Sequence, residues 1–283
     1  MKKIEEPIIL IDYLLTILKK PRKKAKSLLT NGLIYINGEK QTKYNYPLLP
    51  GNIIEIKEYN TKAMEQSDLE IIYEDKDLIV VNKPAGLLTI ATEKEKEKTL
   101  YHKVSSYVKK KNKNARIFII HRLDKETSGI IMFAKHESIK KIYQENWEKL
   151  VLYRGYTALV EGRPNNSEAR IINYLEENPK TMKVYSTTKG NGKEAITNYK
   201  IIKTNNKYTL LDIDLETGRK NQIRVCMHDL KCPIVGDEKY GSKIKILKRM
   251  ALHAHRLSII NHKTGNKMDF NSDIPKLFIK LIK

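Results

Sequence analysis

The chain has 283 residues with 54 Lys and Arg against 33 Asp and Glu, which gives a formal net charge of +21 at pH 7. That length allows roughly two domains, and the positive charge favours a polyanionic partner, either nucleic acid or an anionic membrane surface. No apolar stretch approaches the ~20 residues of a membrane-spanning helix, acidic residues interrupt any signal-peptide core near the N-terminus, and Cys226 and Cys232 fit no metal-binding or redox spacing.

Residues 1–60 predict a small separate domain of α/β type. Apolar residues at helical spacing predict two helices before Asn31-Gly32, which is a typical helix stop. Short strands are expected at 33–36 and 53–56, and Asn37-Gly38 predicts a tight turn after the first of them.

The second of the two expected helices is strongly basic. Its candidate RNA-binding side chains are Arg22, Lys23, Lys24 and Lys26. A basic helix followed by Gly32, Asn37 and Gly38 resembles the small RNA-binding domain named after the fourth protein of the ribosomal small subunit. The resemblance implies that this helix contacts RNA. A solvated basic helix without a ligand is the alternative, and the heavy use of lysine throughout the chain would explain part of the charge.

Residues 61–68 show no apolar period and are expected to form a linker. Residues 69–283 are rich in strand patterns and predict a second domain, with a helix at 136–150. Its strands are expected near 153–160, 195–202, 207–215, 222–226 and 251–260. Since apolar and acidic residues alternate cleanly in the third of these, the prediction is class α+β, with a mainly antiparallel mixed sheet and flanking helices.

The stretch 117–135 is the most informative part of the sequence. Two apolar runs of strand character flank the polar segment HRLDKETSG, which begins at His121, and a polar loop between buried strands commonly carries chemistry. Asp124 is the best candidate for the reacting group, because a nearby cation such as Arg122 would keep its carboxylate ionised. An ordinary surface turn is the alternative. The segment resembles the central motif of the RluA-like family of pseudouridine synthases, which isomerise uridine within RNA, and the resemblance implies that Asp124 is catalytic.

A second segment, LYRGYTALVEG at 152–162, resembles the basic-x-Tyr-x-Ala strand of the same family. The resemblance implies that Tyr156 stacks on the flipped uracil and takes part in catalysis. Arg154 stands where the family commonly has lysine, so an RNA contact is still expected there. The alternative is that Tyr156 is one of the chain's sixteen tyrosines with only a packing role.

The third family motif is matched by residues 215–241. The resemblance makes Arg224 the catalytic arginine, expected to pair with Asp124 although one hundred residues separate them, and makes Arg219 an RNA contact. Asn221 and Met227 stand where the family often has histidine, and neither is expected to carry the reaction.

Two further candidates for RNA contact come from the resemblance. Lys83 lies in the NKPAG turn, 82–86, and is a possible phosphate ligand. Arg122 is expected either to fill the space left by the flipped nucleotide or to contact a phosphate.

A metal site is the remaining chemical possibility. His253 and His255 alternate along the LHAHRL strand and could face one ion, but no acidic or cysteine residue nearby completes a ligand set. No phosphate-binding glycine loop is present, so neither metal nor cofactor is expected.

The sequence therefore predicts an RNA pseudouridine synthase that acts on large-subunit ribosomal RNA or a precursor ribosomal particle. A cytoplasmic monomer with no membrane association is expected. A transfer-RNA pseudouridine synthase is one alternative. A non-catalytic RNA-binding ribosome-assembly factor is another, but it would be expected to lack at least one of Asp124, Tyr156 and Arg224.

Overall fold

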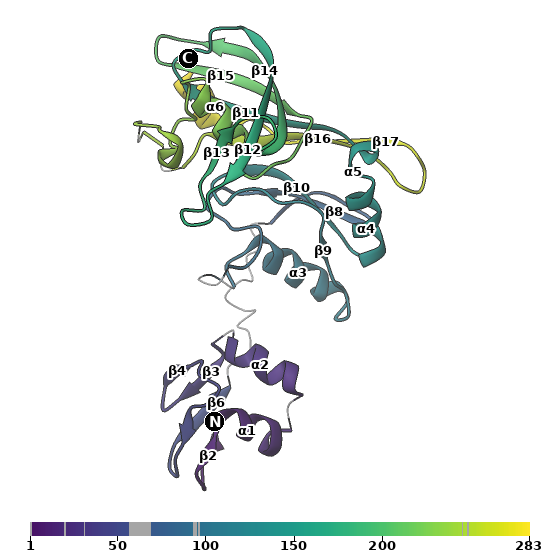
Figure 1. Cartoon of the computed structure of the whole chain (residues 1–283). Helices are drawn as coiled ribbons and strands as arrows, with labels where there is room; N and C mark the ends of the chain where they lie inside the picture. Colours follow the sequence, from purple (N-terminus) through teal and green to yellow (C-terminus); the bar gives the residue numbers. More distant parts are fainter. Residues whose placement is uncertain are drawn as a thin grey trace. The chain divides into compact units, whose positions relative to one another are not determined.

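In the computed structural model the described residues are 2–19, 21–30, 32–56, 69–92, 95, 97–244, 246–247 and 249–283. The predicted linker 61–68 lies outside them. The chain divides into two compact units, one of residues 1–67 with 92–97 and one of residues 68–91 with 98–283 (Figure 1). The boundary predicted at 60–69 stays a prediction.

The N-terminal unit packs helices against a small sheet. The helices are α1 (Leu10–Asp12), the π-helical turn η1 (Tyr13–Ile17) and α2 (Arg22–Thr30). The four-stranded sheet has the order β1 (Lys2–Lys3), β6 (Ile53–Ile56), β3 (Ile34–Ile36), β4 (Glu39–Gln41), and β2 (Ile8–Ile9) pairs separately with β5 (Pro47–Leu48). The predicted tight turn is confirmed, because Asn37 and Gly38 both adopt positive φ, at 51° and 84°.

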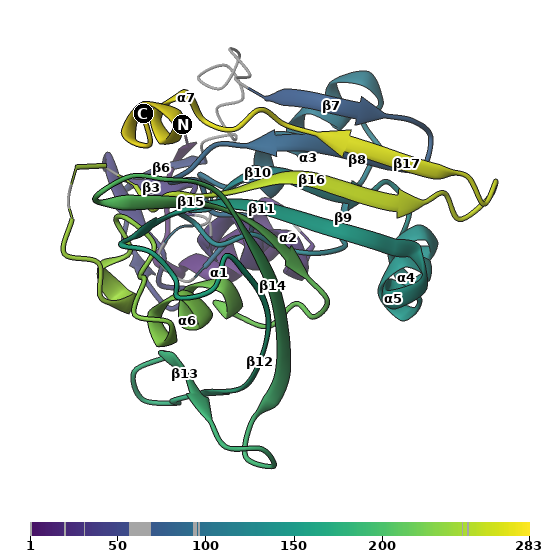
Figure 2. The same cartoon turned by 90° about the horizontal axis from the view of Figure 1, so that it is seen from above.

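The C-terminal unit is built on one large sheet, in the order β13-β12-β14-β15-β11-β16-β10-β8-β7 (Figure 2). The strands are β7 (Glu70–Glu74), β8 (Leu78–Lys83), β10 (Ser128–Ala134), β11 (Val151–Glu161), β12 (Glu168–Glu177), β13 (Val184–Thr187), β14 (Lys193–Thr204), β15 (Tyr208–Leu215) and β16 (Leu252–Ile260). β9 (Phe118–Ile119) pairs with β10, and β17 (Lys267–Asn271) pairs with β16. Among the described strand pairs of this unit, β10 with β16 is parallel and the others are antiparallel. The predicted α+β class is confirmed.

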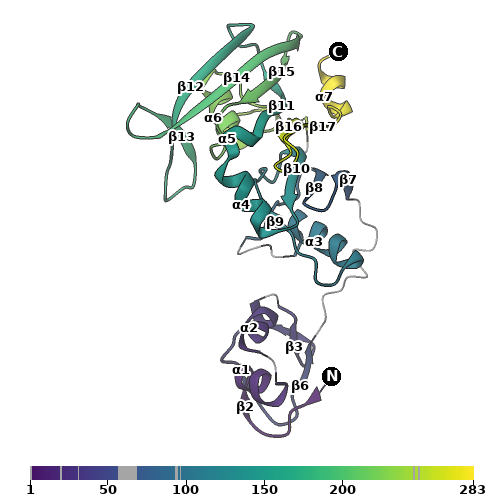
Figure 3. The ribbon, with the colours of Figure 1, turned by 90° about the vertical axis from the view of Figure 1, so that its right-hand side faces the viewer.

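Helices pack against several strands of the sheet. They are α3 (Leu100–Lys111), α4 (Glu137–Glu145), α5 (Trp147–Leu150), α6 (Gln222–Asp229), the 3-10 turn η3 (Glu238–Tyr240) and α7 (Lys276–Leu281). Every residue of β10 is buried. Ile130, Met132 and Ala134 pack in the core that includes α4, and Ile131 and Phe133 pack in the core that includes α3. Figure 3 shows the ribbons of α3, α4 and β10. Because both faces are buried, β10 is held firmly and the loop that leads into it has a defined position.

The strand predicted at 222–226 is wrong, because this segment forms helix α6. The run is rich in β-branched residues, which favoured a strand. Ile223, Cys226 and Met227 instead follow helical spacing and bury together in the core of the unit. The helix predicted at 136–150 forms as α4 and α5, separated at Asn146. Strand β12 was not anticipated. No described helix is long and apolar enough to cross a membrane.

Candidate active site

A cleft forms where the loop before β10, strand β11 and the start of α6 meet. It contains the three residues predicted to be catalytic, which come from positions far apart in the sequence. Its lining residues are Arg122, Leu123, Asp124, Thr127, Tyr156, Leu215, Arg219, Asn221, Gln222, Ile223, Arg224 and Leu252.

The turn that carries Asp124 is anchored on both sides. The Thr127 amide donates to the Asp124 carbonyl at 3.2 Å, which closes the turn before β10. The Thr89 hydroxyl donates to the Leu123 carbonyl at 2.7 Å and accepts from the Leu123 amide at 3.3 Å. Gly129 then lets β10 approach β16 closely, since a Cβ there would lie 2.1 Å from the Ala254 oxygen. The side chain of Asp124 stays 36% exposed, so it is accessible to a ligand.

Arg224 binds Asp124, as predicted. Its Nη1 lies 3.2 Å from Asp124 Oδ2. The main partner of Arg224, however, is Asp237, whose two carboxylate oxygens accept from Nε and Nη2, both at 2.7 Å. Burial opposes the charge of the Arg224 guanidinium, but its hydrogen bonds and charge interaction with Asp237 outweigh burial and raise its pKa. Asp237 therefore orients Arg224 and leaves one N–H edge facing Asp124.

Asn221 and Tyr240 complete the support of Arg224. Asn221 has a left-handed backbone, φ 55°, and its Oδ1 accepts from Arg224 Nη1 at 3.2 Å. Its Nδ2 donates to the Tyr240 hydroxyl at 3.0 Å, and the Arg224 guanidinium lies 4.8 Å from the centre of the Tyr240 ring. Sequence reasoning gave these residues and Asp237 no such role. Asn221, Asp237 and Tyr240 lie in the same segment as Arg224, residues 215–241, and this is the signal that could have identified them.

Tyr156 lies on β11, where its ring packs partly buried against both neighbouring core clusters. Burial raises the pKa of its hydroxyl, the Arg154 charge lowers it, and the Asp124 charge raises it, with a net upward shift. The phenol therefore keeps its proton near neutral pH. Tyr156 lines the same cleft as Asp124, so its ring can stack on a flat ligand bound there.

The chain shares both of its domains with known proteins. The family of RNA pseudouridylate synthases matches residues 77–229, and the S4 domain matches residues 10–54. The chain belongs to the RNA pseudouridylate synthase family. It is thus an isomerase, a pseudouridine synthase with an N-terminal S4 domain.

Relatives of the synthase extend along most of the chain. The ribosomal large subunit pseudouridine synthase C of Rickettsia felis is 34% identical over 87% of this chain and 79% of its own length. An uncharacterized RNA pseudouridine synthase of Bacillus subtilis, YhcT, is 31% identical over 88% of this chain and 85% of its own. Among solved structures, human RNA pseudouridylate synthase domain containing 4 has a TM-score of 0.62 at 23% identity, covering 77% of this chain and 92% of that one, and it shares the fold.

The predicted RNA contacts of the synthase occupy different places. Arg122 and Arg219 are exposed and line the cleft. Arg154 does not line it; this side chain donates to the Leu215 carbonyl at 2.8 Å and lies 5.5 Å from the Trp147 ring centre. Arg22, Lys24 and Lys26 are exposed on α2 in the other unit, and the side chain of Lys23 lies outside the described part. Their binding of RNA stays a prediction.

The phosphate contact predicted for Lys83 does not fit the structure. Lys83 is fully buried, and its ammonium donates to the carbonyls of Pro84 at 3.0 Å, Leu87 at 2.8 Å and Lys125 at 3.0 Å. Burial lowers its pKa to about 8. The three donors of Lys83 are used within the protein, so Lys83 joins the 82–87 turn to the loop that carries Asp124.

Replacing Lys83 tests this correction. Lys83→Met should lower the free energy of unfolding by about 1–3 kcal/mol, because the carbonyls of Pro84, Leu87 and Lys125 lose their shared donor. The salt dependence of RNA binding should stay unchanged, since no phosphate contact is removed. Urea denaturation and RNA titrations at several salt concentrations measure the two effects. A reduced salt slope with unchanged stability would instead support the original prediction that Lys83 contacts an RNA phosphate.

The two histidines considered as metal ligands have other partners. His253 Nδ1 lies 2.8 Å from the Ser128 hydroxyl, which also accepts from Arg249 Nη2 at 2.7 Å. His255 Nδ1 lies 3.1 Å from the Thr157 hydroxyl. Within the described part of the chain, no group of three or more His, Cys, Asp or Glu side chains could hold a metal ion.

Stability of the synthase should fall in mild acid because of His253. This side chain is 2% exposed, and burial, with the Arg249 charge, lowers its pKa from 6.5 to about 4. Between those two values the unfolded chain holds a proton that the folded chain lacks, so the free energy of unfolding drops as pH falls through this window, by on the order of 3 kcal/mol. Urea denaturation at pH 7 and pH 4 measures the drop. His253→Asn should show a smaller one; an equal drop would contradict the assignment.

Proposed function

We propose that the synthase isomerises uridines of large-subunit ribosomal RNA, free or in a precursor particle, with Asp124, Tyr156 and Arg224 as its catalytic residues. The observation that carries the catalytic part is the 3.2 Å pair of Arg224 with Asp124, in a cleft that Tyr156 also lines. The target is supported by relatives named for the ribosomal large subunit and by the S4 domain. Such a target would place the synthase in ribosome biogenesis in the cytoplasm.

The reaction moves the uracil from one attachment to another. The bond between ribose C1′ and base N1 breaks, the base turns, and C1′ joins base C5; the proton on C5 leaves and N1 ends with a proton. The uridine must first leave its stack to reach the cleft. Asp124 either attacks C1′ or assists formation of a glycal intermediate.

The other two residues assist Asp124. Arg224, oriented by Asp237, holds the Asp124 carboxylate in position through its Nη1. Tyr156 offers the uracil a ring face, and its protonated hydroxyl suits a hydrogen-bond donor better than a base. Arg122, exposed at the cleft, is placed to contact a phosphate or to fill the space left by the flipped nucleotide.

Tritium release tests the proposal directly. Large-subunit ribosomal RNA is prepared with uridine labelled by tritium at C5 and incubated with the synthase. Attachment at C5 displaces the label, so release reports isomerisation at that atom. Release from ribosomal RNA but not from transfer RNA would support the proposed target. The reverse pattern would move the target to transfer RNA, and release from neither would contradict the catalytic role proposed for the cleft.

The basic helix α2 should contribute to RNA affinity. Changing Arg22, Lys23, Lys24 and Lys26 together to Gln should weaken binding and flatten its salt dependence, by about one unit of slope for each phosphate that the helix no longer binds. Titrations of ribosomal RNA between low and physiological salt measure the slope. If the slope stays at the wild-type value, α2 is a solvated helix with no RNA contact.

A further inference from the structure

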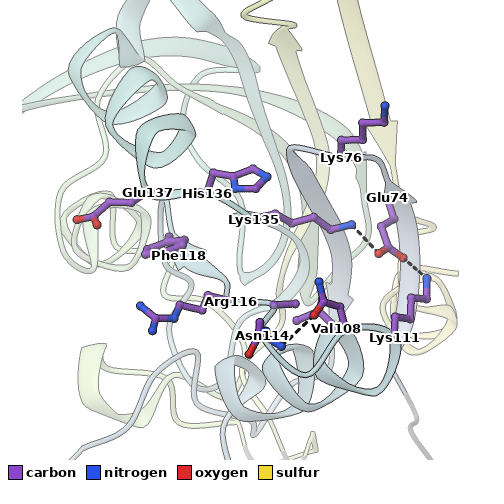
Figure 4. A pocket seen from close by; sticks show the side chains of 12 residues that line it. Glu74, Lys76, Val108, Lys111, Asn114, Arg116, Phe118, Lys135, His136 and Glu137 are labelled. Atoms are coloured by element: carbon purple, nitrogen blue, oxygen red, sulfur yellow. Dashed lines mark hydrogen bonds and ion pairs between the residues drawn. The ribbon is translucent and has the colours of Figure 1, made fainter.

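A second pocket of the C-terminal unit plays no part in the proposed reaction. It lies between the end of α3 and the start of α4, and its side chains are shown in Figure 4. Asp124 precedes β10, whereas Lys135 and His136 of this pocket follow its last residue. The seven residues of β10 rise about 3.3 Å each, so the two sites lie roughly 20 Å apart. We call this site the α3 pocket.

The α3 pocket combines an apolar lining with a basic rim. Val108, Ala115 and Phe118 supply apolar side chains, and Phe118 is only partly buried. The chain segment 109–116, KKKNKNAR, contains five cations and no acid, and we call it the rim. Its Lys111 and Arg116 line the pocket, and Lys109, Lys110 and Lys113 are their neighbours in the sequence. All five are exposed; they are Lys109, Lys110, Lys111, Lys113 and Arg116.

The dipole of helix α3 accounts for only part of the positive charge on this rim. Lysines in the last turn of a helix interact favourably with its dipole, which accounts for residues 109–111. Lys113 and Arg116 lie beyond the end of α3, where that interaction has faded. Among the described residues, Lys111 has an ion-pair partner, Glu74 at 2.9 Å, and the other four cations of the segment have none.

Two carboxylates line the pocket, Glu74 and the exposed Glu137, against the four cations of the rim that have no ion-pair partner within the described part of the chain. Glu74 pairs with Lys135 at 2.7 Å and with Lys111 at 2.9 Å (Figure 4). It also accepts from the Tyr107 hydroxyl at 2.9 Å. Burial opposes its charge, but these partners outweigh burial and lower its pKa to about 2. Glu74 is therefore satisfied within the protein, and the free cations of the rim remain available to an anion.

We propose that the α3 pocket binds an unpaired nucleotide of the substrate RNA at a position away from the uridine that reacts. The base would lie against Phe118, and its phosphates would contact Lys113, Arg116 and the lysines before them. An aromatic face bordered by cations is the combination that holds single-stranded nucleic acid. Since stacked nucleotides are about 3.4 Å apart, roughly six of them span the distance to Asp124. The inference shares with the proposed function only the assumption that RNA is the ligand.

A matched pair of variants tests the basic rim. The pocket variant changes Lys109, Lys110, Lys113 and Arg116 to Gln. The control variant changes Lys203, Lys207, Lys276 and Lys280 to Gln; these are exposed residues of the same unit, so both variants lose four charges. Affinity for transcribed large-subunit ribosomal RNA is measured by filter binding at several salt concentrations. We expect the pocket variant to bind at least tenfold more weakly and to lose about two to four units of salt slope, and the control to lose less than one unit. Equal losses in the two variants would overturn the proposal.

A second variant tests the base contact. Phe118→Leu keeps an apolar side chain in the core but removes the ring, so affinity for a single-stranded RNA oligomer should fall about tenfold while the unfolding midpoint changes little. Unchanged affinity of Phe118→Leu would contradict the proposed contact between the nucleobase and the Phe118 ring. If the pocket variant kept RNA affinity but lost binding to polyglutamate, the partner would be an acidic protein segment and the RNA assignment would be overturned.

Turnover separates this inference from the proposed function. At saturating RNA the pocket variant should release tritium at the wild-type rate, with only KM raised, because the cleft around Asp124 is untouched. Wild-type protein that releases no tritium would contradict the proposed function. The RNA affinities of the pocket and control variants would still show whether the α3 pocket binds RNA.

Discussion

Asp124→Asn should abolish tritium release, lowering turnover by at least about three orders of magnitude. An amide of the same size can neither attack ribose C1′ nor take a proton as a carboxylate does. RNA affinity should stay within a few-fold of wild type. Asp237 continues to hold Arg224 through two 2.7 Å hydrogen bonds, and Thr89 and Thr127 continue to anchor the loop. Single-turnover tritium release and filter binding on the same RNA measure the two properties.

Glu126→Gln is the matched control for this experiment. It removes a carboxylate from the same loop, two residues further on, that does not line the cleft. Its turnover should remain near that of wild type. Comparable inactivation of the two variants would mean that loop charge, and not the Asp124 carboxylate, sets the rate. A large loss of RNA affinity in Asp124→Asn would make Asp124 a structural residue.

Asp237→Ala should have the largest effect on stability, lowering the free energy of unfolding by about 3–5 kcal/mol. The Asp237 side chain is 1% exposed and that of Arg224 is 15% exposed, so the change leaves a buried guanidinium without its main counter-charge. At temperatures where the variant stays folded, turnover should also fall, since Arg224 is no longer oriented toward Asp124. Urea denaturation and tritium release measure the two consequences.

A double-mutant cycle separates the interaction energy of Arg224 with Asp237 from the cost of truncating each side chain. Arg224→Met combined with Asp237→Ala removes both charges, so the double variant should lose several kcal/mol less than the sum of the two single losses. Additive losses would show that the two side chains act independently. An Asp237→Ala variant within 1 kcal/mol of wild type would contradict a buried ion pair at this position.

The sequence by itself determined the chemical class of this protein and the general nature of its fold. The string around Asp124, the strand around Tyr156 and the segment around Arg224 each identified a residue that the structure places in one cleft. Strand β15 could also be predicted, because alternation of apolar and acidic residues is a local pattern with the period of a strand. The same holds for the turn at Asn37-Gly38, where two residues alone decide the backbone conformation.

Only the tertiary structure decided how these residues are held. Residues 222–226 could be read as a strand, and it is packing of one face into the core that makes them a helix and directs Arg224 toward Asp237. Lys83 looked like a surface cation, yet three carbonyls from two separate segments surround its ammonium. The physical reason is the same in both cases: local patterns depend on neighbours in sequence, whereas burial and ion pairing depend on groups that only folding brings together.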